Sequence, residues 1–207
     1  MKIGILGSGN IGGSLGRLWA KAGHEICFAS RSPDSLAPLV AQAGAGAQAG
    51  TLEEATAFAE VILEALPFSA TMELSAEALA GKTLISAANY YPPRDGEVDL
   101  GGLSQTEALA HRLPRTTLVK AFNMMFATEM EALANGEGTP GRAIFYAGDD
   151  AEAKAIAAQL IETAHFVPID TGPLHNGRYF ENGAPLYAKL WDADTARAEL
   201  AAVEAEA

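Results

Sequence analysis

The sequence predicts an α/β protein built on a doubly wound, mainly parallel sheet with a small C-terminal α/β extension. Apolar runs of strand length alternate with segments of helical period along most of the chain, which is typical of a parallel sheet covered by helices on both faces. The length of 207 residues suits one well-buried unit. The glycine-rich stretch GSGNIG, residues 7–12, directly follows the first apolar run, where such folds pass from a strand into a helix.

The first elements follow from apolar periodicity and from cap residues. Their expected strands are residues 2–6, 25–29 and a short one around 45–49. Ser32, followed by Pro33, reads as an N-cap and a first helical residue, so we expect a helix from there to about residue 43. Thr51 and Glu54 have the spacing of a capping box for the next helix.

The later part of the chain continues the same alternation. Its expected strands are residues 61–66, 82–89, 117–123, 142–147 and 166–170. The longest loop, residues 90–102, is rich in proline and glycine and could form a lid. Asp150 caps a helix that reaches about residue 164, and apolar spacing predicts an amphipathic helix over residues 181–191.

The glycine loop matches G-x-G-x-x-G in the strand–turn–helix context that gives this motif meaning. Gly7 permits the tight turn, Gly9 lets the backbone approach a pyrophosphate, and Gly12 lets the helix pack close to the strand. The backbone N–H groups of Asn10 and Ile11 then face the phosphates, with the helix dipole behind them. The sequence therefore predicts a Rossmann-type dinucleotide site.

The end of the second strand lacks the carboxylate that usually binds the adenosine ribose. It reads Ala29-Ser30-Arg31-Ser32. An acid there would repel the 2′-phosphate of NADP, whereas Arg31 can bind that phosphate through a planar fork. Ser30 and Ser32 add further donors, although Ser32 also has the capping duty. We therefore expect NADP(H) rather than NAD(H).

Composition excludes several classes of partner. The net charge is −12 and the basic residues are scattered, which argues against nucleic acid or an anionic membrane as partner. The single cysteine, Cys27, lies in an apolar run, so we expect a buried thiol and a reducing cytoplasm. No apolar run approaches membrane-spanning length, and the histidines lack metal-ligand spacing, so neither a membrane nor a metal site is expected.

At this point the sequence resembles a known family, the NADP-dependent oxidoreductases of the coenzyme F420-dependent NADP reductase type. It is also similar to the cytosolic reductase domain of the six-transmembrane metalloreductases. The stretches that carry the resemblance are KIGILGSGNIG at 2–12, SRS at 30–32, LPF at 66–68, KAFN at 120–123 and VPIDTGPLHNGRYFENGAPLYAKLW at 167–191.

The resemblance implies an NADP-binding Rossmann domain over residues 1–140. It implies that residues 141–207 pack on the same unit, complete an acceptor pocket and contribute to a homodimer. The implied activity is hydride transfer between NADP(H) and a flavin-type acceptor such as F420, FMN or FAD. The stretch KAFNMMF at 120–126 departs from the deazaflavin reductases and is closer to the metalloreductase-like branch, which leaves the acceptor open.

The resemblance also assigns site residues by position. Those implied at the pyrophosphate and the 2′-phosphate are Ser8, Asn10, Ile11, Ser30 and Arg31. Those implied near the nicotinamide and its ribose are Leu66, Pro67, Phe68, Ala88, Asn89, Asn123 and the backbone of Met124 to Phe126. Those expected near the acceptor are Asn123, Leu174 and His175.

Two of these positions, and Glu64 in addition to them, have their own physical interpretation. Asn123 closes a strand at the carboxyl edge of the sheet, where open α/β sheets bind ligands. His175 lies in a glycine-flanked turn after the last strand, either as a surface turn residue or as a proton donor. Glu64 lies inside a buried-looking run and needs a partner; Lys120 is one option, although another strand should separate the two.

Three hypotheses for function follow. The leading one is an enzyme that moves a hydride between NADP(H) and a flavin-type or deazaflavin coenzyme, which requires no catalytic acid or base. The second is an NADPH-dependent reductase of a small carbonyl or imine, with His175 or Tyr90 as proton donor. The third is a non-catalytic NADP-binding sensor.

Overall fold

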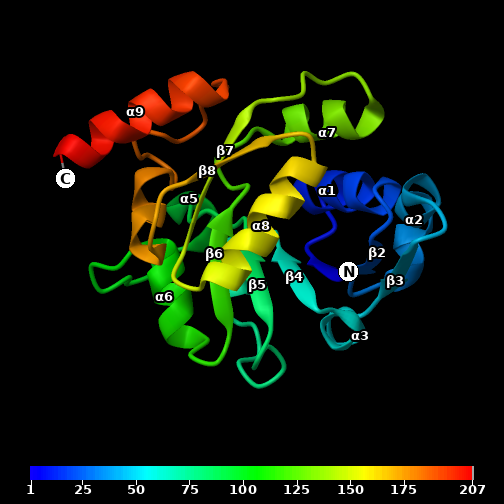
Figure 1. Cartoon of the computed structure of the whole chain (residues 1–207). Coiled ribbons are helices and arrows are strands. Elements are labelled where there is room, and N and C mark those ends of the chain that lie inside the picture. Colours follow the sequence, from blue (N-terminus) through cyan, green and yellow to red (C-terminus); the bar gives the residue numbers. More distant parts are fainter. Residues whose placement is uncertain (207) are drawn as a thin grey trace.

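The chain folds around a single eight-stranded sheet in the computed structural model, which describes residues 1–206 (Figure 1). The strands are β1 (Lys2–Leu6), β2 (Glu25–Ala29), β3 (Ala47–Gly50), β4 (Val61–Glu64), β5 (Thr83–Ser86), β6 (Thr117–Ala121), β7 (Ala143–Gly148) and β8 (Val167–Asp170). Their spatial order is β3-β2-β1-β4-β5-β6-β7-β8. The first six strands are parallel, in the order of a Rossmann fold. Strand β7 runs antiparallel to β6, and β8 pairs parallel with β7.

Helices cover both faces of the sheet. The longer ones are α1 (Asn10–Lys21), α2 (Ala37–Ala43), α3 (Leu52–Phe58), α6 (Gln105–Arg112), α7 (Ala127–Asn135), α8 (Ala151–Thr163) and α9 (Ala193–Glu206). The short ones are α4 (Phe68–Thr71), α5 (Pro92–Asp95) and the 3-10 turns η1 (Pro33–Leu36) and η2 (Leu174–Tyr179). The apolar side chains of α1, α7 and α8 form one core with one face of the sheet, and those of α3 and α6 form a second core on the other face.

Trp19 shows how α1 is fixed on its face of the sheet. Its side chain is fully buried, its ring packs edge-on against Phe122 with centroids 5.8 Å apart, and its indole N–H donates to the carbonyl of Leu160 at 2.9 Å. Burying an aromatic ring of this size while its N–H is satisfied is strongly stabilising. Trp19 thereby ties α1 to α8, which lies far along the chain.

Two glycines of the first loop are required by the protein's own packing. Gly7 has φ of +103°, and a Cβ there would lie 2.4 Å from the carbonyl oxygen of Ala65. A Cβ on Gly12 would lie 2.2 Å from the carbonyl oxygen of Gly7. The roles predicted for these residues in the turn and in close helix packing fit this geometry.

The structure corrects several expected boundaries. The strands predicted to end at residues 66, 89 and 123 end earlier, at 64, 86 and 121. The apolar residues that follow each strand belong to the loops at the edge of the sheet. The third strand is residues 47–50 rather than 45–49. The helix expected from Ser32 to residue 43 is a 3-10 turn followed by α2, which restarts with Pro38 in its first turn.

The helix predicted over residues 181–191 was wrong, because this segment consists of turns. Gly183 has φ of +87°, Pro185 follows it, and Ala188 has φ of +54°. The backbone N–H of Leu186 bonds the carbonyl of Tyr179 at 3.0 Å. Turn hydrogen bonds within the segment and this bond to Tyr179 therefore replace the helical ladder, while the tail after residue 192 forms α9.

Candidate functional site

The glycine loop presents the N-terminus of α1 without a protein cap. Gly9 is the N-cap residue, it provides no side-chain hydrogen bond, and the first turn holds no acidic residue. A Cβ on Gly9 would meet no atom within 4 Å. The protein's own packing does not require glycine at this position. A pyrophosphate that lies close to the protein backbone would require it, because a Cβ would stand in the way. The free N–H groups at Asn10 and Ile11 therefore fit a dinucleotide pyrophosphate.

The residues that follow β2 fit the second phosphate of NADP. Arg31 is exposed, and its side chain makes no hydrogen bond or ion pair with residues 1–206. The hydroxyl of Ser30 accepts from the N–H of Ser32 at 3.0 Å, which shapes this turn. Ser8 fixes the neighbouring loop, because its hydroxyl donates to the carbonyl of Ala29 at 3.0 Å.

Ser32 is the N-cap residue of η1 with Pro33 directly after it, as predicted, but the side-chain capping bond expected of it is absent. Its side chain makes no cap hydrogen bond, and its carbonyl accepts instead from the N–H and the hydroxyl of Ser35. A 3-10 turn closed by Ser35 needs no side-chain acceptor at Ser32, because the backbone carbonyl already takes that role.

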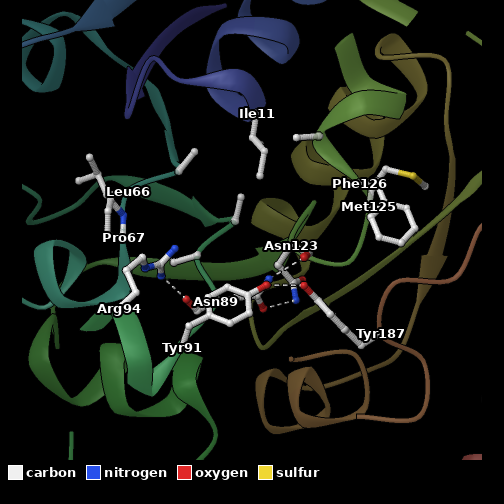
Figure 2. Close-up of a pocket in the computed structure, with 14 residues that line it drawn as sticks. Ile11, Leu66, Pro67, Asn89, Tyr91, Arg94, Asn123, Met125, Phe126 and Tyr187 are labelled. Atoms are coloured by element: carbon white, nitrogen blue, oxygen red, sulfur yellow. Dashed lines mark hydrogen bonds between the residues drawn. The ribbon is translucent and has the colours of Figure 1, made fainter. Parts of the chain in front are cut away.

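A pocket of about 440 Å³ opens where β1, β4, β5 and β6 end (Figure 2). This is the point at which the strand order reverses, where Rossmann folds bind ligands, and the volume suits a small organic molecule. Eight predicted site residues line it: Ile11, Leu66, Pro67, Ala88, Asn89, Asn123, Met125 and Phe126. They come from four separate loops that the sheet brings together.

Asn89 and Asn123 form the floor of the pocket as a buried pair. The side-chain N–H of Asn89 donates to the carbonyl of Asn123 at 2.7 Å, and that of Asn123 donates to Oδ1 of Asn89 at 3.0 Å. Asn123 also donates to the carbonyl of Phe180 at 2.8 Å. The pair joins the ends of β5 and β6 to the C-terminal turns. Oδ1 of Asn123 is buried without a partner in residues 1–206.

The sequence prediction included Met125, in the range Met124 to Phe126, but missed six residues of the pocket: Ala65, Ala87, Tyr91, Arg94, Ala127 and Tyr187. The hydroxyls of Tyr91 and Tyr187 hydrogen bond to one another at the lower edge of the pocket in Figure 2. Burial, together with this bond, raises the pKa of Tyr187. The stretch Tyr90-Tyr91-Pro92-Pro93 directly after a strand was the signal in the sequence, but spacing alone could not say which tyrosine points inward.

Other predicted site residues lie outside this pocket. Met124 and Phe68 are buried, and Phe68 packs against the ring of Tyr90 with centroids 5.5 Å apart. Leu174 is buried in the core on the α6 face, whereas His175 is exposed in η2. The hydroxyl of Tyr90 donates to the carbonyl of Gly96 and accepts from the N–H of Val98. None of these side chains lines the pocket, so their predicted roles stay predictions.

Glu64 has a hydrogen-bonded environment beneath the pocket. Its fully buried carboxylate accepts from the N–H of Leu66 at 2.7 Å and from the hydroxyls of Thr71 at 2.6 Å and Ser86 at 2.9 Å. Glu64, Ser86 and Lys120 are paired across β4, β5 and β6. The intervening strand therefore supplies Ser86 as the direct partner, with Lys120 beyond it. Burial raises the pKa of Glu64 despite these hydrogen bonds.

Lys120 supports the pocket floor from below. Its ammonium group is fully buried and donates to the carbonyl of Ala88, beside Asn89. Burial lowers the pKa of Lys120, while the nearby Glu181 and Glu64 carboxylates oppose that effect. Glu181 in turn accepts from the N–H groups of Gln105 at 3.2 Å and Thr106 at 3.3 Å. This buried network positions the loop after β5.

The N-terminal part of the chain, which holds the glycine loop, matches a known family. Residues 2–90 match the family described as "NADP oxidoreductase coenzyme F420-dependent". A hypothetical protein from Sinorhizobium meliloti has the same architecture, with a TM-score of 0.78 and 30% identity over 94% of this chain and 96% of its own. The chain belongs to this NADP oxidoreductase family.

Two further relatives place this oxidoreductase more widely. It is 34% identical over 183 residues to the rat (Rattus norvegicus) metalloreductase STEAP3, covering 87% of this chain but 36% of that protein. The chain thus spans little more than a third of the length of the curated relatives it matches. A solved structure assigned as an F420-dependent NADP reductase from Arthrobacter has a TM-score of 0.67 and 25% identity, covering 100% of this chain and 92% of its own.

Within residues 1–206, no helix is both long enough and apolar enough to cross a membrane. The same residues hold no cluster of three or more His, Cys, Asp or Glu side chains arranged to bind a metal ion.

Proposed function

We propose that this oxidoreductase transfers a hydride between NADP(H) and a flavin-type or deazaflavin coenzyme that binds in the pocket. The observation that carries the proposal is the pocket's lining. It includes no His, Asp, Glu, Lys or Cys, and its titratable side chains are Tyr91, Arg94 and Tyr187. Hydride transfer to a flavin-type ring needs two ring faces held together rather than a catalytic acid or base.

The walls of the pocket suit such an arrangement. Ile11, Leu66 and Met125 give apolar surface around the site, and Phe126 is 46% exposed at its rim. When bound, NADPH supplies the hydride and its two electrons to the acceptor ring, and solvent supplies the proton that completes the reduced coenzyme. The chain's own contribution is to fix the two rings and to exclude water between them.

Anaerobic NADPH oxidation with purified protein tests the proposal. We expect enzyme-dependent oxidation with at least one of F420, FMN, FAD or riboflavin, with one acceptor reduced for each NADPH consumed. NADPH binding without oxidation in the presence of any of the four would contradict it and would favour the non-catalytic sensor.

A second candidate, reduction of a small carbonyl or imine, is favoured by the tyrosine pair. Tyr91 and Tyr187 place phenol groups at the pocket, and a phenol is protonated at neutral pH, as a proton donor requires. This function predicts that Tyr187→Phe and Tyr91→Phe each abolish turnover of a carbonyl or imine substrate while NADPH still binds. Flavin reduction would survive both changes.

A further inference from the structure

Arg94 is a charged side chain of the pocket that the transfer of a hydride does not use. It lies in α5, in the loop after β5, and lines the pocket beside Leu66 and Pro67. Figure 2 shows it across the pocket from Met125 and Phe126. Arg94 is the one positively charged side chain among the described residues that line the pocket. The chain has a net charge of −12, so an anionic ligand needs local cationic or N–H donor groups to bind at this site.

The donors of Arg94 are only partly used. An arginine has five N–H donors. Nε donates to Oδ1 of Asp95 at 3.0 Å, and Nη2 donates to Oδ2 of Asp95 at 2.8 Å and to the carbonyl of Asn89 at 2.7 Å. Nη1 has no partner within residues 1–206, and the side chain is 46% exposed. The two N–H groups of Nη1 therefore remain free for a ligand.

Asp95 holds this guanidinium in a fixed orientation. Its side chain is fully buried and also accepts from the N–H of Tyr91 at 2.9 Å and from the N–H and hydroxyl of Ser69 at 3.3 Å. Burial opposes its ionisation, but the hydrogen bonds from Arg94, Tyr91 and Ser69 prevail and lower the pKa of Asp95 to about 2. The ring of Tyr91 stacks 5.0 Å from the guanidinium. Arg94 is thus a preorganised donor rather than a mobile surface arginine.

The strand order separates Arg94 from the sites that suit the phosphates of NADP. The glycine loop follows β1 and Arg31 follows β2, whereas Arg94 follows β5, on the far side of β4. We propose that Arg94, held by Asp95, binds an oxoanion carried by the hydride acceptor, such as the phosphate of FMN. This inference rests on the proposed function and names one feature of its substrate: an anionic group outside the reacting ring.

FMN and riboflavin make the test, because they differ only by the phosphate. The measurements are the anaerobic KM of each flavin with NADPH, and the Kd of each flavin for the NADP⁺ complex by fluorescence quenching. The proteins compared are the parent, Arg94→Ala, Arg94→Lys and the control Arg115→Ala. Arg115→Ala removes the same single positive charge as Arg94→Ala. Arg115 is exposed just before β6, at the edge of the sheet opposite the pocket, so it should not contact the flavin.

The parent protein should prefer FMN over riboflavin by about tenfold, as expected for a charge-assisted hydrogen bond. Arg94→Ala should abolish the preference by weakening FMN alone, Arg94→Lys should keep part of it, and Arg115→Ala should keep all of it. An equal response of the parent to both flavins would overturn the inference, as would a preference that survives Arg94→Ala. If none of FMN, riboflavin, FAD and F420 is turned over, the proposed function fails, and the same preference measured as Kd still supports or overturns the role of Arg94.

Discussion

The two sides of the ligand site are built in different ways. On the cofactor side, β1, the glycine loop and the end of β2 form a short continuous segment, residues 2–32, and the backbone makes most of the site. On the acceptor side, side chains meet from distant segments. The hydroxyls of Tyr91 and Tyr187 hydrogen bond to one another, and the side chain of Asn123 donates to the carbonyl of Phe180. The carboxylate of Glu181 accepts from a backbone N–H in the first turn of α6. The difference teaches that the proposed cofactor site is shaped by local geometry, whereas the proposed acceptor site depends on tertiary structure.

Two alanine substitutions in the glycine loop should separate folding from cofactor binding, with the largest effects. Gly12→Ala places a Cβ 2.2 Å from the backbone oxygen of Gly7, so we expect the free energy of unfolding to fall by about 1–3 kcal/mol. Gly9→Ala meets no protein atom within 4 Å, so stability should be retained while NADPH affinity falls about tenfold or more. Urea denaturation and NADPH titration measure the two effects. Retained NADPH affinity in Gly9→Ala would show that the pyrophosphate does not approach this loop.

Arg31→Ala should change cofactor preference without changing the fold. Its side chain is exposed and unbonded among the residues described, so its removal should cost little stability. We expect NADPH to bind about 10- to 100-fold more weakly, because a charge-assisted contact to the 2′-phosphate is lost. NADH binding, measured in parallel by titration, should be nearly unchanged. Equal weakening of both cofactors would mean that Arg31 acts on the shared adenosine instead.

The lowered pKa of Asp95 makes the free energy of unfolding depend on pH in the acid range. Its pKa is lowered from 3.8 to about 2 in the folded protein. A carboxyl group with a lowered pKa contributes stability above its unfolded value, and this contribution is lost as the pH falls through the folded value. Asp95→Asn should therefore flatten the decline in unfolding free energy between about pH 4 and pH 2. An unchanged acid limb in denaturation curves would contradict the ion pair with Arg94.

The tyrosine pair should give the smallest effect. Tyr91→Phe, Tyr187→Phe and the double variant form a thermodynamic cycle across residues far apart in sequence. We expect a coupling energy of about 0.5–1.5 kcal/mol in thermal or urea unfolding, the usual contribution of one hydrogen bond. Additive effects of the two single changes would mean that the loop after β5 and the C-terminal turns are not joined by this contact.

The contrast between the two sides also explains which features the sequence could predict. The glycine loop, β1, β2 and the capping box at Thr51 are set by short-range rules, and the structure confirms them. The segment 181–191 forms its own turns and a hydrogen bond from Leu186 to Tyr179 of η2, which apolar spacing cannot reveal. Arg94 and Tyr91 were missed for a related reason: their direction depends on Asp95 and on Tyr187, which only the folded chain brings close.

Glu64 shows the same limit inside the sheet. Its place in a buried strand was evident from the sequence, but its partners depend on strand register. The pairing of Glu64 with Ser86, and of Ser86 with Lys120, follows from the order β4-β5-β6. Neither composition nor periodicity contains that register, although the alternation of elements predicted the parallel sheet that creates it.

The central claim is that the protein transfers a hydride from NADPH to a flavin-type acceptor. The most direct test is to mix the protein anaerobically with NADPH and FMN and to record the absorbance changes of NADPH and of FMN over time. We expect FMN to be bleached at the rate at which NADPH is oxidised, in equal amounts, and Gly9→Ala to slow the reaction at limiting NADPH because it weakens NADPH binding. Parallel runs with riboflavin, FAD and F420 cover the other acceptors of the same class. Tight NADPH binding without reduction of any of the four would contradict the account.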